Sequence, residues 1–136
     1  MKINYIVVML LLITPLLFFA CSRKKSVNYV EGGLYASPRE KGGYNIIKIL
    51  KKEKDGYHVR TYSNVYSKVP KSINPDDLFM VGMDKGNETQ DPGMGHLPIG
   101  KQSFETWSLT FIQKVNVEQK ELEGYDMWKE ANGGYF

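Results

Sequence analysis

Apolar and polar positions alternate most clearly in the first half of the chain, where they predict a β-hairpin. Residues 44–50 place apolar side chains on both faces of an extended chain, which is typical of a strand buried on both sides. Asp55 and Gly56 follow, and both tolerate the positive φ of a type I′ turn. Residues 57–62 then alternate again, so we expect an antiparallel hairpin over this region.

Shorter patterns predict further elements. Residues 78–81 form an apolar run after two prolines, and we expect a buried strand there. Residues 96–100 indicate another extended piece, with its proline at an edge or end, and residues 109–117 predict a further strand. Phe104 and Trp107 lie three apart, which favours one helical turn with both rings on one face.

The last element predicts a helix. Asn116 and Gln119 have capping-box spacing, and residues 133–134, both glycine, are a stop signal. Gly124 inside the helix costs about 1 kcal/mol relative to Ala, so we expect another element to approach it closely. Three large residues at helical spacing predict a stripe that packs in the core: Leu122, Tyr125 and Trp128.

Several short strands followed by a terminal helix predict an α+β fold. We expect a small, strongly bent antiparallel sheet or an SH3-like partial barrel, with the C-terminal helix closing it. Residues 27–136 have the length of one domain, which we expect to be monomeric.

The N-terminus has the order of parts of a signal peptide. Lys2 precedes an uncharged apolar run over residues 5–20, and the small residue Ala20 stands before Cys21. Cys21 is the only cysteine of the chain, so a disulfide framework within the chain is excluded.

Residues 18–21, with the sequence Phe-Phe-Ala-Cys, resemble the lipobox of bacterial lipoproteins. The resemblance implies that residues 1–20 are removed and that the Cys21 sulfur carries a diacylglycerol. Residues 21–26 would then be a lipidated tether, and the protein would be a lipid-anchored membrane protein of the cell envelope, facing the periplasm or the exterior. The alternative is an uncleaved N-terminal anchor, which would also tether the domain to a membrane.

The charge of the chain is divided unequally along the sequence. The whole chain carries a net charge of +3, but residues 26–136 hold 14 basic and 15 acidic side chains, so we expect no nucleic-acid partner. Residues 39–71 hold 9 basic and 3 acidic side chains, whereas residues 72–136 hold 5 and 11. We expect the two halves to pack together and partly neutralise each other, with a basic partner-binding face as the alternative.

Two further resemblances concern the domain itself. Segments that include GHLPIG and ELEGYDMW resemble a small uncharacterised bacterial domain over most of residues 32–136, which implies no catalytic or cofactor residue. The stretch GGLYASPREKGGYNIIKIL, residues 32–50, is similar to the first strands of some immunity-protein families of polymorphic toxin systems. That likeness implies a role in neutralising a toxin.

The candidate binding surface lies on the second strand of the predicted hairpin. Period-2 alternation puts His58, Arg60 and Tyr62 on one side, which we expect to be exposed, and His96 and Tyr66 extend the set. Arginine, histidine and tyrosine together suit an anionic group, a carbohydrate or a protein anchor. The alternative is an ordinary solvated strand face, with cross-strand pairs to the lysines of the preceding strand.

The chain contains no phosphate-binding loop, zinc-ligand spacing or nucleophile elbow, so we expect no metal or cofactor. The sequence favours a membrane-anchored binding or interaction module, whose partner is an envelope protein or carbohydrate. The alternative is an envelope hydrolase, which needs a concave pocket with a perturbed acid or base.

Overall fold

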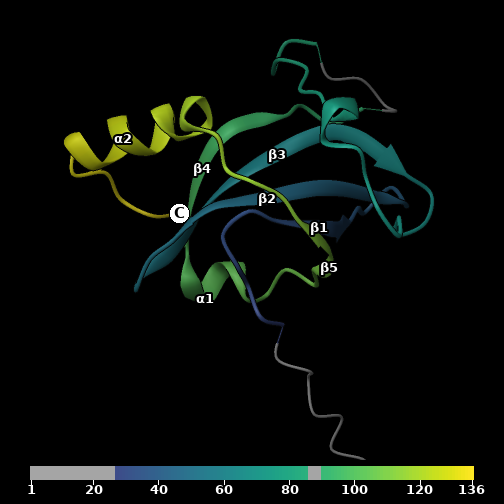
Figure 1. Ribbon diagram of the computed structural model, residues 1–136, viewed down its shortest axis with the longest axis horizontal. Helices are drawn as coiled ribbons and strands as arrows, with labels where there is room; N and C mark the ends of the chain where they lie inside the picture. Colours follow the sequence, from purple (N-terminus) through teal and green to yellow (C-terminus); the bar gives the residue numbers. More distant parts are fainter. Residues whose placement is uncertain (1–26, 86–89) are drawn as a thin grey trace, which may run out of the picture.

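The computed structural model describes residues 27–85 and 90–136 (Figure 1), so Cys21 and the rest of the predicted signal and tether lie outside the described residues. Five strands form one antiparallel sheet in the order β4-β3-β2-β1-β5. The strands are β1 (Gly33–Pro38), β2 (Tyr44–Lys52), β3 (Gly56–Tyr66), β4 (Met94–Gly100) and β5 (Thr110–Lys114). The expected α+β fold is confirmed, and the sheet is open, with β4 and β5 as its edges.

In the described part of the chain, four short helices connect or cover these strands: η1 (Pro75–Asp77), α1 (Lys101–Phe104), η2 (Gln119–Leu122) and α2 (Glu123–Glu130). Figure 1 shows α1 on one side of the sheet, and α2 and the segment around η1 toward the other. No helix in the described ranges is long and apolar enough to cross a membrane.

The predicted hairpin is confirmed as β2 and β3, the second of which continues to Tyr66. The Glu53 amide donates to the Gly56 carbonyl at 2.9 Å and closes the turn at the expected Asp-Gly pair. Lys48 lies opposite Arg60, and the register shifts twice along the pair of strands. These irregularities bend a sheet and increase its twist.

Both faces of the sheet are covered, which explains why β2 is apolar on both sides. One face packs a core rich in aromatic rings: Tyr29, Tyr35, Ile47, Ile49, Tyr57, Val59, Ile99, Phe104 and Leu109. The rings of Phe104 and Trp107 lie 5.3 Å apart, as the three-residue spacing predicted. The opposite face packs a smaller buried cluster: Leu34, Ile46, Tyr62 and Ile73.

The expected strand over residues 78–81 is wrong. This segment follows η1 and has no regular structure, and Phe79 and Met80 are each 42% exposed. It is held to β3 through Ser63, whose amide donates to the Phe79 carbonyl and whose hydroxyl accepts from the Val81 amide. This apolar run therefore forms an irregular and partly exposed segment beside β3. A short run of apolar residues does not by itself show that a segment is a buried strand.

The C-terminal helix is confirmed, but its predicted cap is wrong. The capping box is formed by Glu118 and Glu121, and the helix begins as η2 before it continues as α2. The Asn116 carbonyl instead accepts a hydrogen bond from Lys48 at 2.7 Å, and Glu118 keeps an extended backbone. Within the predicted stripe only Tyr125 is buried, while its two partners are half-buried.

The close approach predicted at Gly124 is confirmed. A Cβ at this position would lie 2.5 Å from the Cβ of His96, so only glycine lets the helix come this near to β4.

The end of the chain contacts the same strand. The Phe136 amide donates to the Pro98 carbonyl at 3.1 Å, and the Gly100 amide donates to the Phe136 carbonyl at 2.8 Å.

Candidate functional site

The predicted exposed face of β3 is not exposed. His58 is 0% exposed and Tyr62 7%, and the side chain of Arg60 is 16% exposed. The alternation correctly predicted that these three side chains lie on the same face of β3. The chain after β5 and the segment around η1 cover that face. The structure also divides the set, because His58 contacts His96 in one cluster while Arg60 and Tyr62 belong to another. Tyr66 packs against the smaller core.

The first group, which we call the histidine cluster, consists of His58, His96, Tyr135, Glu53 and Tyr125. His58 Nδ1 lies 2.9 Å from His96 Nε2, and His58 Nε2 lies 3.2 Å from the Tyr135 hydroxyl. Tyr135 and Tyr125 both donate to the Glu53 carboxylate. The cluster thus links β3 and β4 to α2 and the C-terminal segment.

Burial, and secondarily the neighbouring His96, lower the pKa of His58 to about 4. Burial also lowers the pKa of His96. Hydrogen bonds from Tyr125, and more weakly from Tyr135, lower the pKa of Glu53 despite the opposing effect of burial. Both histidines are therefore neutral at pH 7, with one ring nitrogen donating to the other. Within the described ranges, the hydrogen bonds of the two rings join them to each other and to Tyr135, and none involves a serine, threonine or cysteine side chain.

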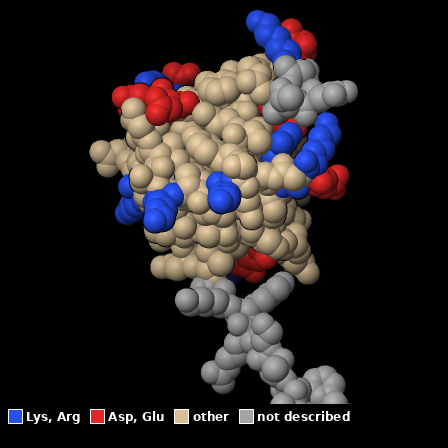
Figure 2. Space-filling view, turned by 90° about the vertical axis from the view of Figure 1, so that its right-hand side faces the viewer, with Lys and Arg blue, Asp and Glu red and all other residues tan. Residues whose placement is uncertain are grey.

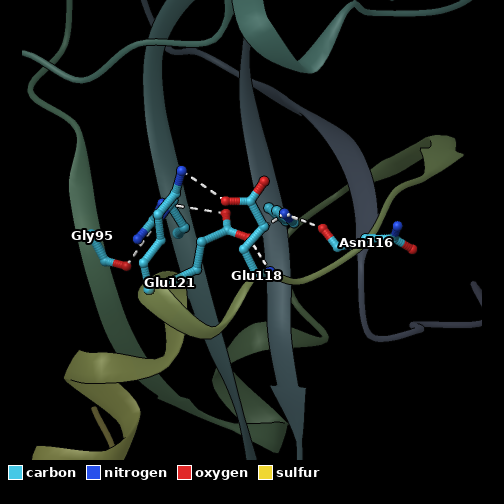
Figure 3. Close-up of polar contacts among 7 residues, drawn as sticks. Gly95, Asn116, Glu118 and Glu121 are labelled. Carbon is cyan, nitrogen blue, oxygen red and sulfur yellow. Dashed lines mark hydrogen bonds and ion pairs between the residues drawn. The ribbon is translucent and has the colours of Figure 1, made fainter.

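The second group, the buried charge network, consists of Lys48, Arg60 and Glu121. Lys48 Nζ lies 2.6 Å from Glu121 Oε2, and an Arg60 terminal nitrogen lies 3.2 Å from Glu121 Oε1. The side chains of Lys48 and Glu121 are each 6% exposed. Figure 3 shows the carboxylates of Glu118 and Glu121 close together, between Gly95 on one side and Asn116 on the other.

Two further hydrogen bonds hold the network in place. The Glu118 amide donates to Glu121 Oε2 at 2.8 Å, and Arg60 Nε donates to the Gly95 carbonyl at 3.2 Å. The network therefore ties β2, β3 and β4 to the start of η2. It also confirms that the basic and acidic halves of the chain neutralise each other in part, as the Arg39–Asp91 ion pair does elsewhere.

A cavity of about 740 Å³ lies above this network, and we call it the charged cavity. Its floor includes Lys48, Arg60 and Tyr62, and its apolar wall includes Phe79 and Met80. The remaining lining residues are Pro75, Asp76, Leu78, Lys114, Val115, Asn116, Glu118, Lys120 and Glu121. Its volume is in the range typical of sites for small organic ligands, about 300–1,000 Å³.

A smaller hollow of about 380 Å³ lies beside Asn45, Thr61 and Trp107. Its one charged lining residue, Asp91, is already paired with Arg39. The charged cavity therefore offers more varied chemistry than this hollow.

The charged cavity lies on the sheet face opposite the point where the chain enters the domain. Tyr29 packs in the core on the α1 side, whereas the cavity residues Tyr62 and Leu78 pack in the core on the other side. Figure 1 agrees, because the described chain begins beside α1 and the segment around η1 lies at the far end of the view.

Two further features of the described residues bear on other kinds of site. Figure 2 shows one face of the molecule, on which the Lys and Arg side chains are spread out, with Asp and Glu side chains near them, and form no single basic patch. Among the described residues, no group of three His, Cys, Asp or Glu side chains is placed to hold a metal ion.

No protein-family model, curated protein or solved structure matches the chain.

Sequence reasoning found Arg60 and Tyr62 but missed Lys48 and Glu121 as site residues. Lys48 stands inside the isoleucine-rich strand that was expected to be buried on both faces. A lysine in such a strand is the signal that could have revealed the network, because buried lysines are almost always paired.

Proposed function

We propose that this protein is a lipid-anchored protein of the cell envelope whose domain binds a ligand in the charged cavity. The observation that carries the proposal is the cavity itself, which combines buried charges with an exposed apolar wall. The lipobox-like end of the apolar N-terminal run supports the anchor. Six residues, 21–26, span at most about 20 Å, so the domain is held close to the membrane surface.

Binding is favoured over catalysis because of where the titratable groups lie. The pKa of His58 is lowered to about 4, so this ring stays neutral at a mildly acidic pH at which an ordinary histidine is protonated. The ring is covered by α2 and the C-terminal segment. The Glu121 carboxylate has both oxygens engaged. A hydrolase needs an acid or base that reaches its substrate. A toxin-neutralising role is one form of the same proposal, in which the ligand is a segment of a protein.

The anchor leads to the first prediction. Cys21→Ser removes the sulfur that would accept the lipid, so we expect the variant to take up no labelled fatty acid and to keep residues 1–20. Metabolic labelling and the mass of the purified chain measure both effects. Wild-type protein that takes up no label and retains its N-terminal segment would contradict the anchor.

The cavity leads to the second prediction. We expect native mass spectrometry of the full chain, gently extracted from membranes, to detect a bound species. Lys114→Glu reverses a charge at the exposed rim of the cavity and changes the net charge of its lining from +1 to −1, so we expect it to reduce this species at least about tenfold. Lys101→Glu, an equally exposed change on α1, should leave it unchanged.

Equal loss in both variants would indicate a general effect of charge. No bound species, or one that persists in the Lys114 variant, would contradict a ligand in this cavity.

A further inference from the structure

The charge balance of the cavity points to one class of ligand, and this inference rests on the function proposed above. The lining contains four cationic and three anionic side chains, so it carries one net positive charge. The cations are Lys48, Arg60, Lys114 and Lys120, and the anions are Asp76, Glu118 and Glu121.

The surplus positive charge lies on the floor. Lys48 and Arg60 share the single carboxylate of Glu121. The other charges balance, because Lys120 pairs with Glu118 at 2.7 Å, while Lys114 and Asp76 contribute one charge of each sign. An occupant that reaches the floor therefore meets more positive than negative charge.

The floor also has hydrogen-bond donors to spare. The Lys48 ammonium has three N–H groups and uses two, on the Asn116 carbonyl and on Glu121. Arg60 has five N–H groups and donates to the Gly95 carbonyl and to Glu121. The Glu121 oxygens are already occupied, so the floor offers donors and few free acceptors.

One surplus charge suits a monoanion better than a dianion. A phosphate dianion would place two negative charges beside Glu121 in a partly enclosed site, and one of them would stay uncompensated. A carboxylate neutralises the surplus and matches the planar donor fork of arginine. The walls formed by Phe79 and Met80 favour a ligand body with apolar surface.

We infer that the charged cavity binds a small organic monocarboxylate. Its carboxylate lies beside Lys48 and Arg60, and its apolar surface lies against Phe79 and Met80. The same chemistry occurs in an acidic sugar and in the C-terminal residue of a peptide, and the experiment below separates these two sources.

The test uses the full chain in detergent micelles with ¹³C-labelled methionine methyl groups. Met80 lines the cavity, and Met127, which is 70% exposed on α2 and does not line it, is an internal reference. Two matched pairs of probes differ only in the acidic group: N-acetylmuramic acid with its amide, and N-acetyl-leucine with its amide. At least one acid should shift the Met80 signal saturably, at least about tenfold more tightly than its neutral twin, and leave Met127 unmoved.

Variants at the rim should change the affinity in opposite directions. Lys114→Gln should weaken binding of the acid several-fold, Asp76→Asn should strengthen it, and Lys101→Gln should leave it unchanged. The neutral twins should respond to none of these changes, because they carry no charge.

Neutral probes that shift Met80 as tightly as the acids would overturn the monocarboxylate while leaving a binding cavity. No shift of Met80 with any probe at millimolar concentration would also overturn it. The native mass spectrometry of the extracted full chain, proposed above, decides separately whether the cavity holds any ligand at all.

Discussion

Glu121→Gln is expected to lower the free energy of unfolding by about 3–5 kcal/mol, because it leaves the buried Lys48 and the half-buried Arg60 without their shared carboxylate. Glutamine has nearly the same volume and helix propensity, so the loss reports the charge. A domain of this size has a total stability of about 5–15 kcal/mol, and the variant would therefore be close to unfolding. Urea unfolding followed by tryptophan fluorescence measures the change.

Glu130→Gln is the matched control, because Glu130 is exposed near the end of α2 and has no ion-pair partner in the described part of the chain. Its effect should stay within about 0.5 kcal/mol. A Glu121 variant as stable as this control would show that solvent reaches Lys48 and Arg60 well enough to compensate for the missing carboxylate.

Acid should destabilise the protein through the histidine cluster. The pKa of His58 is about 4 in the folded protein against 6.5 as its ordinary value, so the unfolded chain binds this proton first. Stability is then fully present above pH 6.5 and is lost as the pH falls from 6.5 toward 4. Between pH 7 and pH 5 the expected loss from His58 is about 2 kcal/mol.

The groups around His58 act in the same direction. His96 also has a lowered pKa, and Glu53 with its lowered pKa adds a further loss as its carboxylate is protonated at lower pH. Tyr125 and Tyr135 stay neutral, because the pKa of each is raised to about 12, that of Tyr125 mainly by its hydrogen bond to Glu53 and that of Tyr135 mainly by burial.

His58→Gln tests this assignment, since glutamine keeps polar atoms near Tyr135 and His96 but does not titrate. The variant should be less stable than wild type at pH 7, yet lose about 2 kcal/mol less between pH 7 and pH 5. Urea unfolding at the two pH values measures both losses. Equal losses in the two proteins would place the acid sensitivity in other groups.

Local chemistry explains which parts of the fold could be predicted from sequence. The hairpin could be predicted from two signals: the apolar residues on both faces of β2, and the Asp55-Gly56 pair, which favours a tight turn. These two signals lie within a few residues of each other. The approach of β4 to Gly124 followed from the cost of glycine inside a helix. These predictions needed no knowledge of distant parts of the chain.

The parts that failed depend on contacts between distant residues. Alternation correctly put His58, Arg60 and Tyr62 on one side of β3, but it does not indicate that later segments cover that side. Lys48 and Glu121 lie 73 positions apart, so no local pattern relates them. The predicted cap at Asn116 was wrong for the same reason. The distant Lys48 donates a hydrogen bond to the Asn116 carbonyl, which lies before the start of the helix.

The way the chain ends beside β4 bears on aggregation. An open sheet has two edges whose free amides and carbonyls can recruit a strand from another molecule. On β4, Pro98 has no amide hydrogen. The backbone of Phe136 is hydrogen-bonded to the carbonyl of Pro98 and to the amide of Gly100. β5 has only five residues, and the exposed ring of Phe111 lies on it. Self-association by strand pairing would therefore begin at β5, and a charged residue in place of Phe111 is the change most suited to suppress it.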